Sequence, residues 1–249
     1  RGVFGLGGYT SEFCGIKAPA ATPERKLHVA AGDPMANWMP HELFAVEPKA
    51  IEELAGFLKA TGWRLIYGLN FGNSTPERAA EEAAYVAKAV GDRLEYFQVG
   101  NEPDLYTRAN NGTRLEGWTF VDYVEEWLDR VRAIGARVPA ARFGGPDVAA
   151  SSDWVPRFGK AVQGERLVAL TGHYYAEGPP DDPAVTIVRL LAGNAKVAEE
   201  TREIAAAAKR ERRVYRMTEG NSCYRGGKPG MSDAFAVSLW AADYLLTLA

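Results

Sequence analysis

The chain has 249 residues, of which 47% are hydrophobic and 24% charged, a composition typical of a globular protein with a sizeable core. Its 29 Lys and Arg against 32 Asp and Glu give a formal net charge of −3, which argues against a nucleic-acid partner. No apolar run reaches the ~18 residues that a membrane span needs, so no membrane partner is expected.

Strands and helices are predicted to alternate along the chain. Apolar runs predict strands at residues 1–8, 63–70, 94–97, 142–147, 167–175 and 213–218. Helical spacing of apolar residues and start and stop signals predict helices at 48–61, 76–91, 119–137, 154–163, 183–211 (with a break near 193–194) and 232–249. Residues 9–47 are predicted to form a long loop, and a loop of that length inside a domain is more often functional than idle.

The strict alternation implies parallel strands joined by right-handed crossovers. Two architectures satisfy it, an open doubly wound sheet and a (β/α)8 barrel. No Gly-x-Gly-x-x-Gly turn joins the first strand to a helix, which weakens a dinucleotide-binding interpretation. Polar residues instead recur after the predicted strands: Glu12, Asn70, Asn101, Glu102, Asp147, His173, Tyr175, Glu219 and Asn221. A ring of polar strand ends on one face is typical of a barrel enzyme, so we predict an α/β fold of the (β/α)8 TIM-barrel type.

Two of these strand ends carry glutamates, Glu102 in Asn-Glu-Pro and Glu219 in Thr-Glu-Gly-Asn. A single glutamate at such a place is usually a solvated loop residue or a helix cap. Two of them at the mouth of one barrel suit glycosidic bond cleavage, which needs one protonated and one ionised carboxyl group. The sequence therefore predicts a glycoside hydrolase whose catalytic pair is Glu102 and Glu219.

Four segments resemble known glycosidases. The segment 99–104, Val-Gly-Asn-Glu-Pro-Asp, resembles the acid/base motif of clan A retaining glycoside hydrolases, whose catalytic glutamates end barrel strands 4 and 7. The segment 217–224, Met-Thr-Glu-Gly-Asn-Ser-Cys-Tyr, resembles the nucleophile strand of glycoside hydrolase family 79, the β-glucuronidase and heparanase family. The segment 7–12 resembles the one after strand 2 of that family, with Tyr9 in place of the usual Asn, and 173–175 resembles strand 6.

The resemblance implies a retaining hydrolase that cleaves β-glucuronides by double displacement through a covalent glycosyl-enzyme. Glu102 would be the general acid/base and Glu219 the nucleophile. Asn101 would hold the 2-hydroxyl of the sugar, and Tyr175 would donate its hydroxyl to Glu219. Tyr174 would point the opposite way, because side chains alternate along a strand.

The family binds the carboxylate of the sugar just beyond the nucleophile, and the matching positions here are Tyr224 and Gly226. Glycine-rich loops expose backbone N–H groups, which suits an anion, although a solvated flexible loop would look the same. Asp33 and Glu12 are further candidates for binding sugar hydroxyls. The expected partner is a short glucuronide or another saccharide containing glucuronic acid, because the chain offers no broad basic groove for a long polyanion.

Counting strands from Glu102 and Glu219 assigns the chain to strands 2–7 of the barrel. Residues 1–249 are thus predicted to be one partial (β/α)8 catalytic barrel that lacks strands 1 and 8 and the C-terminal β-sandwich of the family. A second chain or segment would then complete the barrel. Two alternatives stay open: an inactive or carbohydrate-binding fragment of such a barrel, and a clan A glycosidase of other specificity, such as a xylosidase or glucosidase.

No cofactor is expected, and no metal site either, because His28, His41 and His173 lack the spacing of paired ligands. The two cysteines, Cys14 and Cys223, are expected to be small buried hydrophobic residues rather than a disulfide. The chain opens with Arg-Gly-Val-Phe and shows no signal-peptide pattern, while the family resemblance implies a secreted or periplasmic protein.

Overall fold

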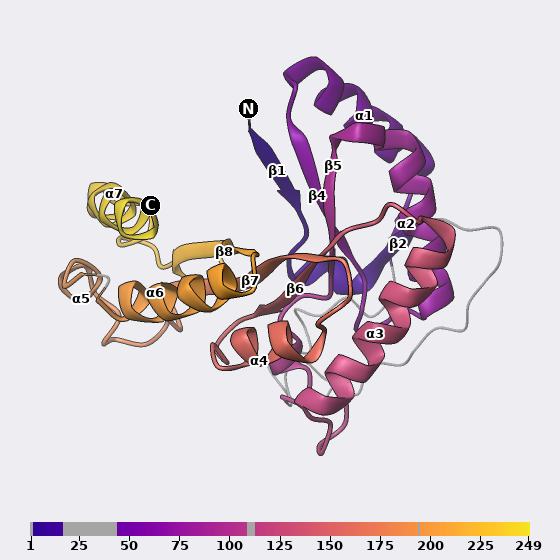
Figure 1. Cartoon of the computed structure of the whole chain (residues 1–249). Helices are drawn as coiled ribbons and strands as arrows, with labels where there is room; N and C mark the ends of the chain where they lie inside the picture. The colour runs from indigo at the N-terminus through magenta and orange to yellow at the C-terminus, as the bar shows by residue number, and fades with distance from the viewer. Residues whose placement is uncertain (1, 17–43, 109–112, 194) are drawn as a thin grey trace.

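The computed structural model describes residues 2–16, 44–108, 113–193 and 195–249. Its centre is a six-stranded, all-parallel sheet in the order β1-β4-β5-β6-β7-β8. The strands are β1 (Val3–Leu6), β4 (Arg64–Leu69), β5 (Leu94–Val99), β6 (Phe143–Val148), β7 (Leu167–Glu177) and β8 (Val214–Cys223). Figure 1 shows this sheet curving round, with the helices outside it. The predicted fold is confirmed: the six strands form a partial barrel of the TIM type.

The connecting helices are α1 (Pro48–Thr61), α2 (Pro76–Val90), α3 (Phe120–Arg137), α4 (Trp154–Ala161), α5 (Ile187–Leu190), α6 (Ala195–Arg210) and α7 (Phe235–Leu248). Their ends follow local chemistry. Pro48 and Pro76 occupy the first positions of α1 and α2, where a missing N–H costs nothing. The hydroxyl of Thr75 accepts a hydrogen bond from the backbone N–H of Arg78 at 3.3 Å and so caps α2. Gly62, with φ 72°, ends α1 in the left-handed conformation that favours glycine.

The interior follows the predicted apolar faces, with one exception. Trp127 of α3 packs edge-on against Phe158 of α4 and Phe143 of β6, with ring centroids 4.9 and 5.9 Å away. Burial of a side chain such as Phe contributes about 1.5–3 kcal/mol. Val121, which the helical spacing assigned to the buried face of α3, is instead 60% exposed. It lies in the first turn, and Tyr123 fills the core there in its place.

The segment 9–47, predicted to be a loop, contains regular structure at both of its ends. Tyr9–Phe13 forms a 3-10 helix directly after β1. β2 (Cys14–Ile16) and β3 (Phe44–Val46) pair in parallel to form a separate two-stranded sheet. Strands of three residues are too short to give a periodic pattern, which is why the sequence does not reveal them. Cys14 and Cys223 are both free thiols; Cys223 is buried, as predicted, whereas Cys14 is only half-buried.

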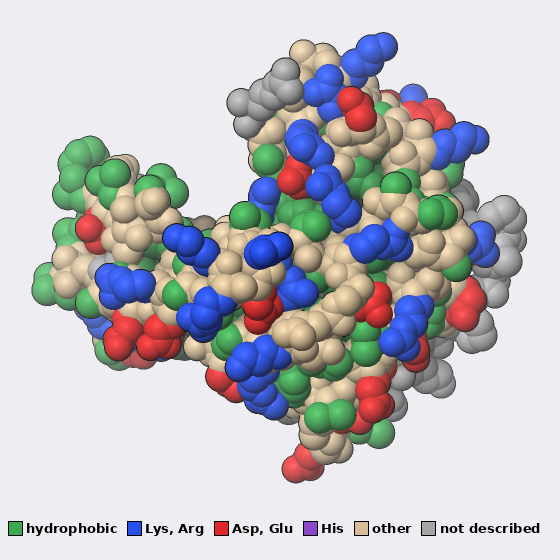
Figure 2. Space-filling view, in the orientation of Figure 1, with side chains coloured by type: hydrophobic (Ala, Val, Ile, Leu, Met, Phe, Trp, Pro, Cys, Tyr) green, Lys and Arg blue, Asp and Glu red, His purple; other side chains and the backbone are tan. Residues whose placement is uncertain are grey.

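β1 and β8 are the two ends of the sheet, and apolar side chains lie exposed along both of them. Val3 and Leu6 of β1 are 41% and 42% exposed, and Val214 of β8 is 51% exposed. A cavity of about 580 Å³ lies between these strands and is lined from both of them and by Leu248 of α7. Figure 2 shows the molecule hollowed on this side, between the α7 end and the β1 end. Within the described ranges, no helix has the length and apolar character to cross a bilayer.

Candidate active site

Glu102 lies three residues beyond the end of β5, in a backbone conformation that non-glycine residues rarely adopt. Its φ and ψ are both 50°, and Asp147, at the end of β6, also has a positive φ of 63°. The two are joined by a hydrogen bond from the backbone N–H of Glu102 to the carbonyl of Asp147 at 2.8 Å. Such residues cost about 1–3 kcal/mol each and cluster at functional sites. The strain supports a functional role for the turn that carries Glu102.

Glu219 lies on β8, across the barrel mouth from Glu102. The hydroxyl of Tyr175 on β7 donates a hydrogen bond to its Oε1, the contact predicted from the sequence. Tyr174 points the other way, as the alternation of a strand requires, and stacks on Tyr244 of α7 with ring centroids 5.6 Å apart. A Cβ at Gly8, two residues beyond β1, would lie 3.5 Å from Oε2 of Glu219, so the turn after β1 comes close to this carboxylate.

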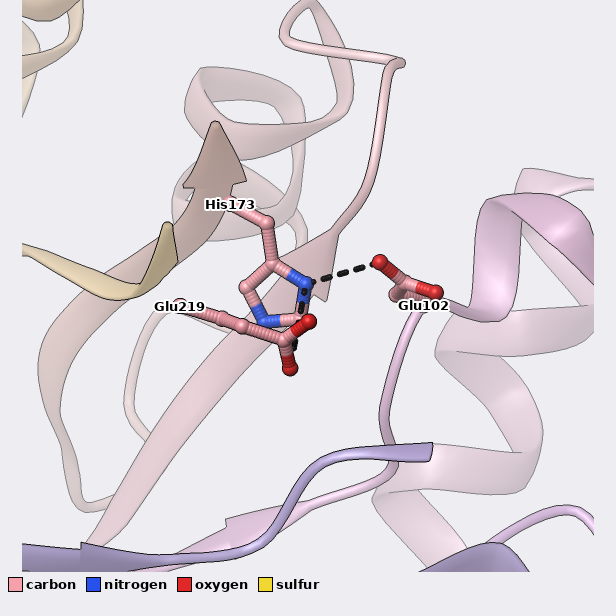
Figure 3. A group of neighbouring side chains, drawn as sticks. All are labelled: Glu102, His173 and Glu219. Atoms are coloured by element: carbon pink, nitrogen blue, oxygen red, sulfur yellow. Dashed lines mark hydrogen bonds and ion pairs between the residues drawn. The ribbon is translucent and has the colours of Figure 1, made fainter. Parts of the chain in front are cut away.

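His173, on β7, joins the two glutamates (Figure 3). Its Nδ1 lies 3.0 Å from Oε1 of Glu102 and 3.9 Å from Oε2 of Glu219. Its Nε2 lies 3.3 Å from Oδ2 of Asp147. Asp147 in turn accepts a 2.5 Å hydrogen bond from the hydroxyl of Thr218, the residue before Glu219. The sequence signalled His173 and Asp147 as polar strand ends, but not that they connect Glu102, after β5, to Thr218 and Glu219 on β8.

The ionisation states at this centre follow from burial and neighbouring charge. Burial raises the pKa of Glu102, and the negative charge of Glu219 raises it further, although the hydrogen bond from His173 lowers it in part. Burial alone would lower the pKa of His173, but the carboxylates of Asp147, Glu102 and Glu219 outweigh burial and hold that pKa well above its ordinary value. A raised pKa is what a glycosidase acid needs, because that group must carry the proton that it donates.

The carboxyl groups of Glu102 and Glu219 share one cavity and lie close together. One oxygen of each, together with a ring nitrogen of His173, falls within a group whose atoms are all within 4.8 Å of one another. The cavity has a volume of about 530 Å³, and Tyr175 and Tyr224 also line it. That volume suits a small ligand such as a monosaccharide with part of its aglycone.

Asn101 is 97% shielded from solvent, with an exposed fraction of 3%, and it lines the neighbouring cavity of about 580 Å³. Its backbone N–H donates to Oε1 of Glu12 at 2.6 Å. Neither atom of its side-chain amide has a hydrogen-bond partner among the described residues. Because buried amides are rarely left unpaired, this one is available to a ligand hydroxyl.

Tyr224 lies at the wall of the catalytic cavity, with its ring edge-on to Tyr175 at 6.2 Å between centroids. Gly226 follows in a turn with φ 82°, a conformation that suits glycine, although it is not among the residues that line this cavity. Tyr9 lines the cavity from the β1 side, and burial and the charge of Glu102 raise the pKa of its hydroxyl to about 12. It therefore stays protonated and can donate a hydrogen bond.

The position of Glu12 corrects the expectation that it binds sugar hydroxyls. Its side chain is buried, with an exposed fraction of 2%, and lines neither cavity. Oε2 accepts hydrogen bonds from the backbone N–H groups of Phe71, at 2.9 Å, and Gly72, while Oε1 accepts from Asn101. A Cβ at Gly72 would come within 2.9 Å of Oε2, so a larger residue there would displace this carboxylate. Glu12 thus holds the loops after β4 and β5 together, beneath the candidate site.

We expect Glu12→Gln to destabilise the protein by about 1–3 kcal/mol, the usual cost of leaving a buried donor or acceptor unsatisfied. Both carboxylate oxygens accept N–H bonds, so either orientation of the new amide turns its NH₂ group toward a backbone donor. Denaturant unfolding measures the change. The matched control is Glu53→Gln on the exposed surface of α1, where the side chain is 69% exposed and the change should stay within about 0.5 kcal/mol. Equal effects of the two substitutions would contradict the role assigned to Glu12.

Asp33, the other candidate for sugar hydroxyls, lies outside the described residues, as do His28 and His41. The remaining histidine is not isolated in space. Glu102, His173 and Glu219 together form a group that could hold a metal ion, which sequence spacing did not indicate. The spacing rule fails here because the three residues are far apart in the sequence: Glu102 follows β5, His173 lies in β7 and Glu219 lies in β8.

Comparison with known proteins identifies the relatives of the chain. No family model matches it. Over 210 residues, 74% of the chain, it is 30% identical to a β-glucuronidase of Aspergillus niger, and over 216 residues it is 27% identical to a β-glucuronidase of Neurospora crassa. The chain is a β-glucuronidase homologue. The aligned part covers 38% and 37% of these two proteins, so the chain spans a little over a third of their length.

Solved structures agree on the fold of this β-glucuronidase homologue. The crystal structure of a 4-O-α-L-rhamnosyl-β-D-glucuronidase from Fusarium oxysporum 12S in complex with Rha-GlcA superposes with a TM-score of 0.73 at 17% identity, covering 98% of this chain and 51% of that one. A GH51 arabinofuranosidase from Xanthomonas axonopodis pv. citri gives 0.62 at 17% identity, covering 99% and 54%. The sequence relatives confirm the resemblance to β-glucuronidases, and these structures confirm the fold that the resemblance implied.

Proposed function

We propose that the chain carries the catalytic centre of a retaining glycoside hydrolase that cleaves β-glucuronides. The supporting observation is the pair Glu102 and Glu219, which face one cavity with carboxylate oxygens within 4.8 Å of each other. Retaining enzymes hold their two carboxyl groups about 5–5.5 Å apart, whereas inverting enzymes need about 6.5–9.5 Å to admit a water between them. The short separation favours retention.

In the first step, Glu219 attacks the anomeric carbon and forms a covalent bond to it. The bond from that carbon to the aglycone oxygen breaks, and Glu102 donates its proton to the leaving oxygen. In the second step, Glu102 is a carboxylate and takes a proton from water as the water oxygen attacks the anomeric carbon. The bond to Glu219 breaks, the free sugar leaves, and both glutamates return to their starting states.

The surrounding side chains suit these two roles. The hydroxyl of Tyr175 stabilises negative charge on Glu219, which must stay ionised to attack. His173 fixes the carboxyl of Glu102 in position, and Asp147 in turn fixes the ring of His173. The unpaired amide of Asn101 is the group we assign to the 2-hydroxyl of the sugar, a contact that strengthens in the transition state.

A glucuronide is the substrate class that the relatives favour, since both sequence relatives are β-glucuronidases. We assign the carboxylate of the sugar to the hydroxyl of Tyr224, which lines the cavity, and to the backbone N–H of Gly226 only where the bound sugar reaches past Arg225 to the turn beyond the wall. Arg225 also lines the catalytic cavity and contributes positive charge there. The Fusarium enzyme, which has the same fold, was crystallised with Rha-GlcA. These observations together favour a uronic acid over a neutral sugar.

The proposal is tested by incubating the purified chain with matched aryl β-glucuronide, β-glucoside and β-xyloside. We expect release of the aryl group from the glucuronide, and initial release of the β-anomer of glucuronic acid, which proton NMR distinguishes from the α-anomer. Preference for the xyloside or glucoside would leave the mechanism intact but reject the substrate class. Initial release of the α-anomer would reject retention.

Tyr224→Phe is expected to lower kcat/KM for the aryl glucuronide by about tenfold to a hundredfold, because hydrogen bonds to charged groups contribute about 1.5–3 kcal/mol. The rate on the matching glucoside, which has no carboxylate, should change little. The ratio of the two kcat/KM values is the measurement, and it cancels any general damage to the fold. An equal loss on both substrates would remove Tyr224 from carboxylate recognition.

The second candidate function is carbohydrate binding without turnover. It is favoured by the exposed apolar residues along the end strands β1 and β8. If a further chain or segment must cover this surface to complete the barrel, the chain alone would bind a sugar without hydrolysing it. Calorimetric titration with glucuronic acid separates the two functions. Saturable binding without any hydrolysis of the aryl glucuronide would favour this candidate over the first.

A further inference from the structure

The three side chains at the candidate catalytic centre also have the composition of a metal site. Two carboxylates and one imidazole converge from β5, β7 and β8 on a cavity open to solvent (Figure 3). We propose that Glu102, His173 and Glu219 bind a divalent transition-metal ion of the zinc type, and that this ion blocks the site. The second part of this proposal, that the bound ion prevents hydrolysis, rests on the proposed function.

The distances suit a tetrahedral ion. With Zn–N and Zn–O bonds of about 2.0–2.2 Å, neighbouring ligand atoms of a tetrahedron lie about 3.4 Å apart. Nδ1 of His173 is 3.0 Å from Oε1 of Glu102 and 3.9 Å from Oε2 of Glu219. These two distances lie just below and just above the ideal separation of ligand atoms. The carboxylate oxygens of Glu102 and Glu219 lie within 4.8 Å of each other and must come somewhat closer to share one ion. Rotation about the terminal bonds of either glutamate supplies that movement.

The surroundings of His173 are those of a metal ligand. Metal-bound histidines usually donate their second ring N–H to a carboxylate, which fixes the tautomer and leaves the other nitrogen free to bind. Nε2 of His173 lies 3.3 Å from Oδ2 of Asp147, while Nδ1 faces the two glutamates. An ion that binds Nδ1 takes the place of the proton on that nitrogen, which is released. Asp147 is itself held by the hydroxyl of Thr218. The supporting carboxylate is thus already in place behind the ring.

Access and ligand type favour zinc over calcium or magnesium. The side chains of Glu102 and Glu219 keep exposed fractions of 15% and 30% on the cavity side, so an ion can reach them and a water can fill the fourth position. An imidazole with two carboxylates is a donor set that Zn²⁺ accepts, whereas Mg²⁺ and Ca²⁺ prefer six or more oxygen ligands. Bound there, the ion would occupy the lone pairs that Glu219 needs for attack and would displace the proton that Glu102 must donate.

Calorimetric titration of the untagged chain with Zn²⁺ alone, without any substrate, tests the site. We expect saturable binding of one ion per chain. Co²⁺ in place of Zn²⁺ should give the visible absorption bands of a tetrahedral ion. His173→Gln and Glu219→Gln should each weaken binding by about tenfold or more, since each removes a ligand. The double variant His28→Gln/His41→Gln removes the other two imidazoles of the chain and should bind Zn²⁺ as the parent does.

Asp147→Asn isolates the support behind His173. Asparagine tolerates the positive φ of this position, and its Oδ1 can still accept from Thr218. Its NH₂ group, however, would donate to Nε2 and move the ring proton to Nδ1, which removes the ligand lone pair. We expect about a tenfold to hundredfold loss of Zn²⁺ affinity, the usual effect of losing such a partner.

Two results would overturn the site: Zn²⁺ binding that is unchanged in His173→Gln while lost in the His28→Gln/His41→Gln double variant, or no saturable binding by a chain whose circular dichroism shows it folded. Because the titration needs no substrate, a chain that is inactive after its metal has been removed with a chelator, yet binds Zn²⁺, would reject the proposed function and leave the metal site standing. An active chain whose hydrolysis is unaffected by saturating Zn²⁺ would reject the blocking role alone.

Discussion

Glu219→Ala is expected to abolish hydrolysis of an aryl glucuronide, with a loss of at least the roughly 10⁴-fold that marks the upper range for a single general acid–base group. The reason is that the substitution removes the covalent pathway itself rather than one contribution to it. Glu219 lies at the cavity wall with an exposed side-chain fraction of 30%, so its removal should leave the fold intact. Release of the aryl group, followed by absorbance, measures the loss.

Addition of azide, a small external anion, tests the nucleophile assignment more directly. Alanine leaves a space beside the anomeric carbon, and azide can enter it and attack from the same side as the missing carboxylate. The product would be an α-glucuronosyl azide, opposite in configuration to the β-glucuronide, because only one displacement has occurred. Recovery of aryl release with azide, together with that product, identifies Glu219 as the nucleophile rather than as a binding group.

The matched control is Glu199→Ala on α6, a glutamate that lies outside the catalytic cavity. Its rate should equal that of the parent, and azide should have no effect on it. Turnover of the Glu219→Ala chain at the parental rate would reject the nucleophile assignment and, with it, the double-displacement mechanism.

The fold was predictable because its signals are local. Apolar runs and the alternation of strands with helices lie in short windows, and caps such as Thr75 and Gly62 mark the boundaries within one residue or two. The placement of the two glutamates at the barrel mouth was predictable for a related reason. A strand end positions its residue at the barrel mouth wherever the strand lies in the sheet, so Glu102 and Glu219 needed no knowledge of their neighbours.

The contacts between strands were not predictable in this way. His173 contacts Glu102, 71 positions before it, and Glu219, 46 positions after it. Nothing in the local sequence pattern selects those partners. Glu12 shows the opposite error. A glutamate after the first strand looks like a ligand for sugar hydroxyls, but whether it points to solvent or into backbone N–H groups depends on the loops after β4 and β5, which only the fold brings together.

Glu102→Ala is expected to lower kcat/KM by about 10²–10⁴-fold on a glucuronide with a poor leaving group, the range typical of general acid catalysis. A glucuronide whose aryl group leaves readily as an anion needs little proton donation, so its first step should be affected far less. The dependence of the loss on leaving-group pKa is therefore the measurement. A uniform loss across leaving groups would indicate that Glu102 binds substrate or supports the site without donating a proton.

The pH profile gives an independent test of the same residue. Burial and the nearby charges of Glu219 and Asp104 raise the pKa of Glu102, and the hydrogen bond and charge of His173 lower it in part. Glu102 is a competent acid below this raised pKa, so kcat/KM should fall as the pH rises through it. That alkaline limb should be absent from Glu102→Ala.

His173→Gln should move the alkaline limb in a direction that a purely structural role would not produce. Without the imidazolium, a contribution that lowers the pKa of Glu102 is lost, while burial and the charge of Glu219 stay. The limb should therefore shift to higher pH even as the maximal rate falls. Loss of His173 must change the pKa of Glu102, because its hydrogen bond and charge both contribute to that pKa. An alkaline limb that stays in place in His173→Gln would therefore mean that a group other than Glu102 governs it.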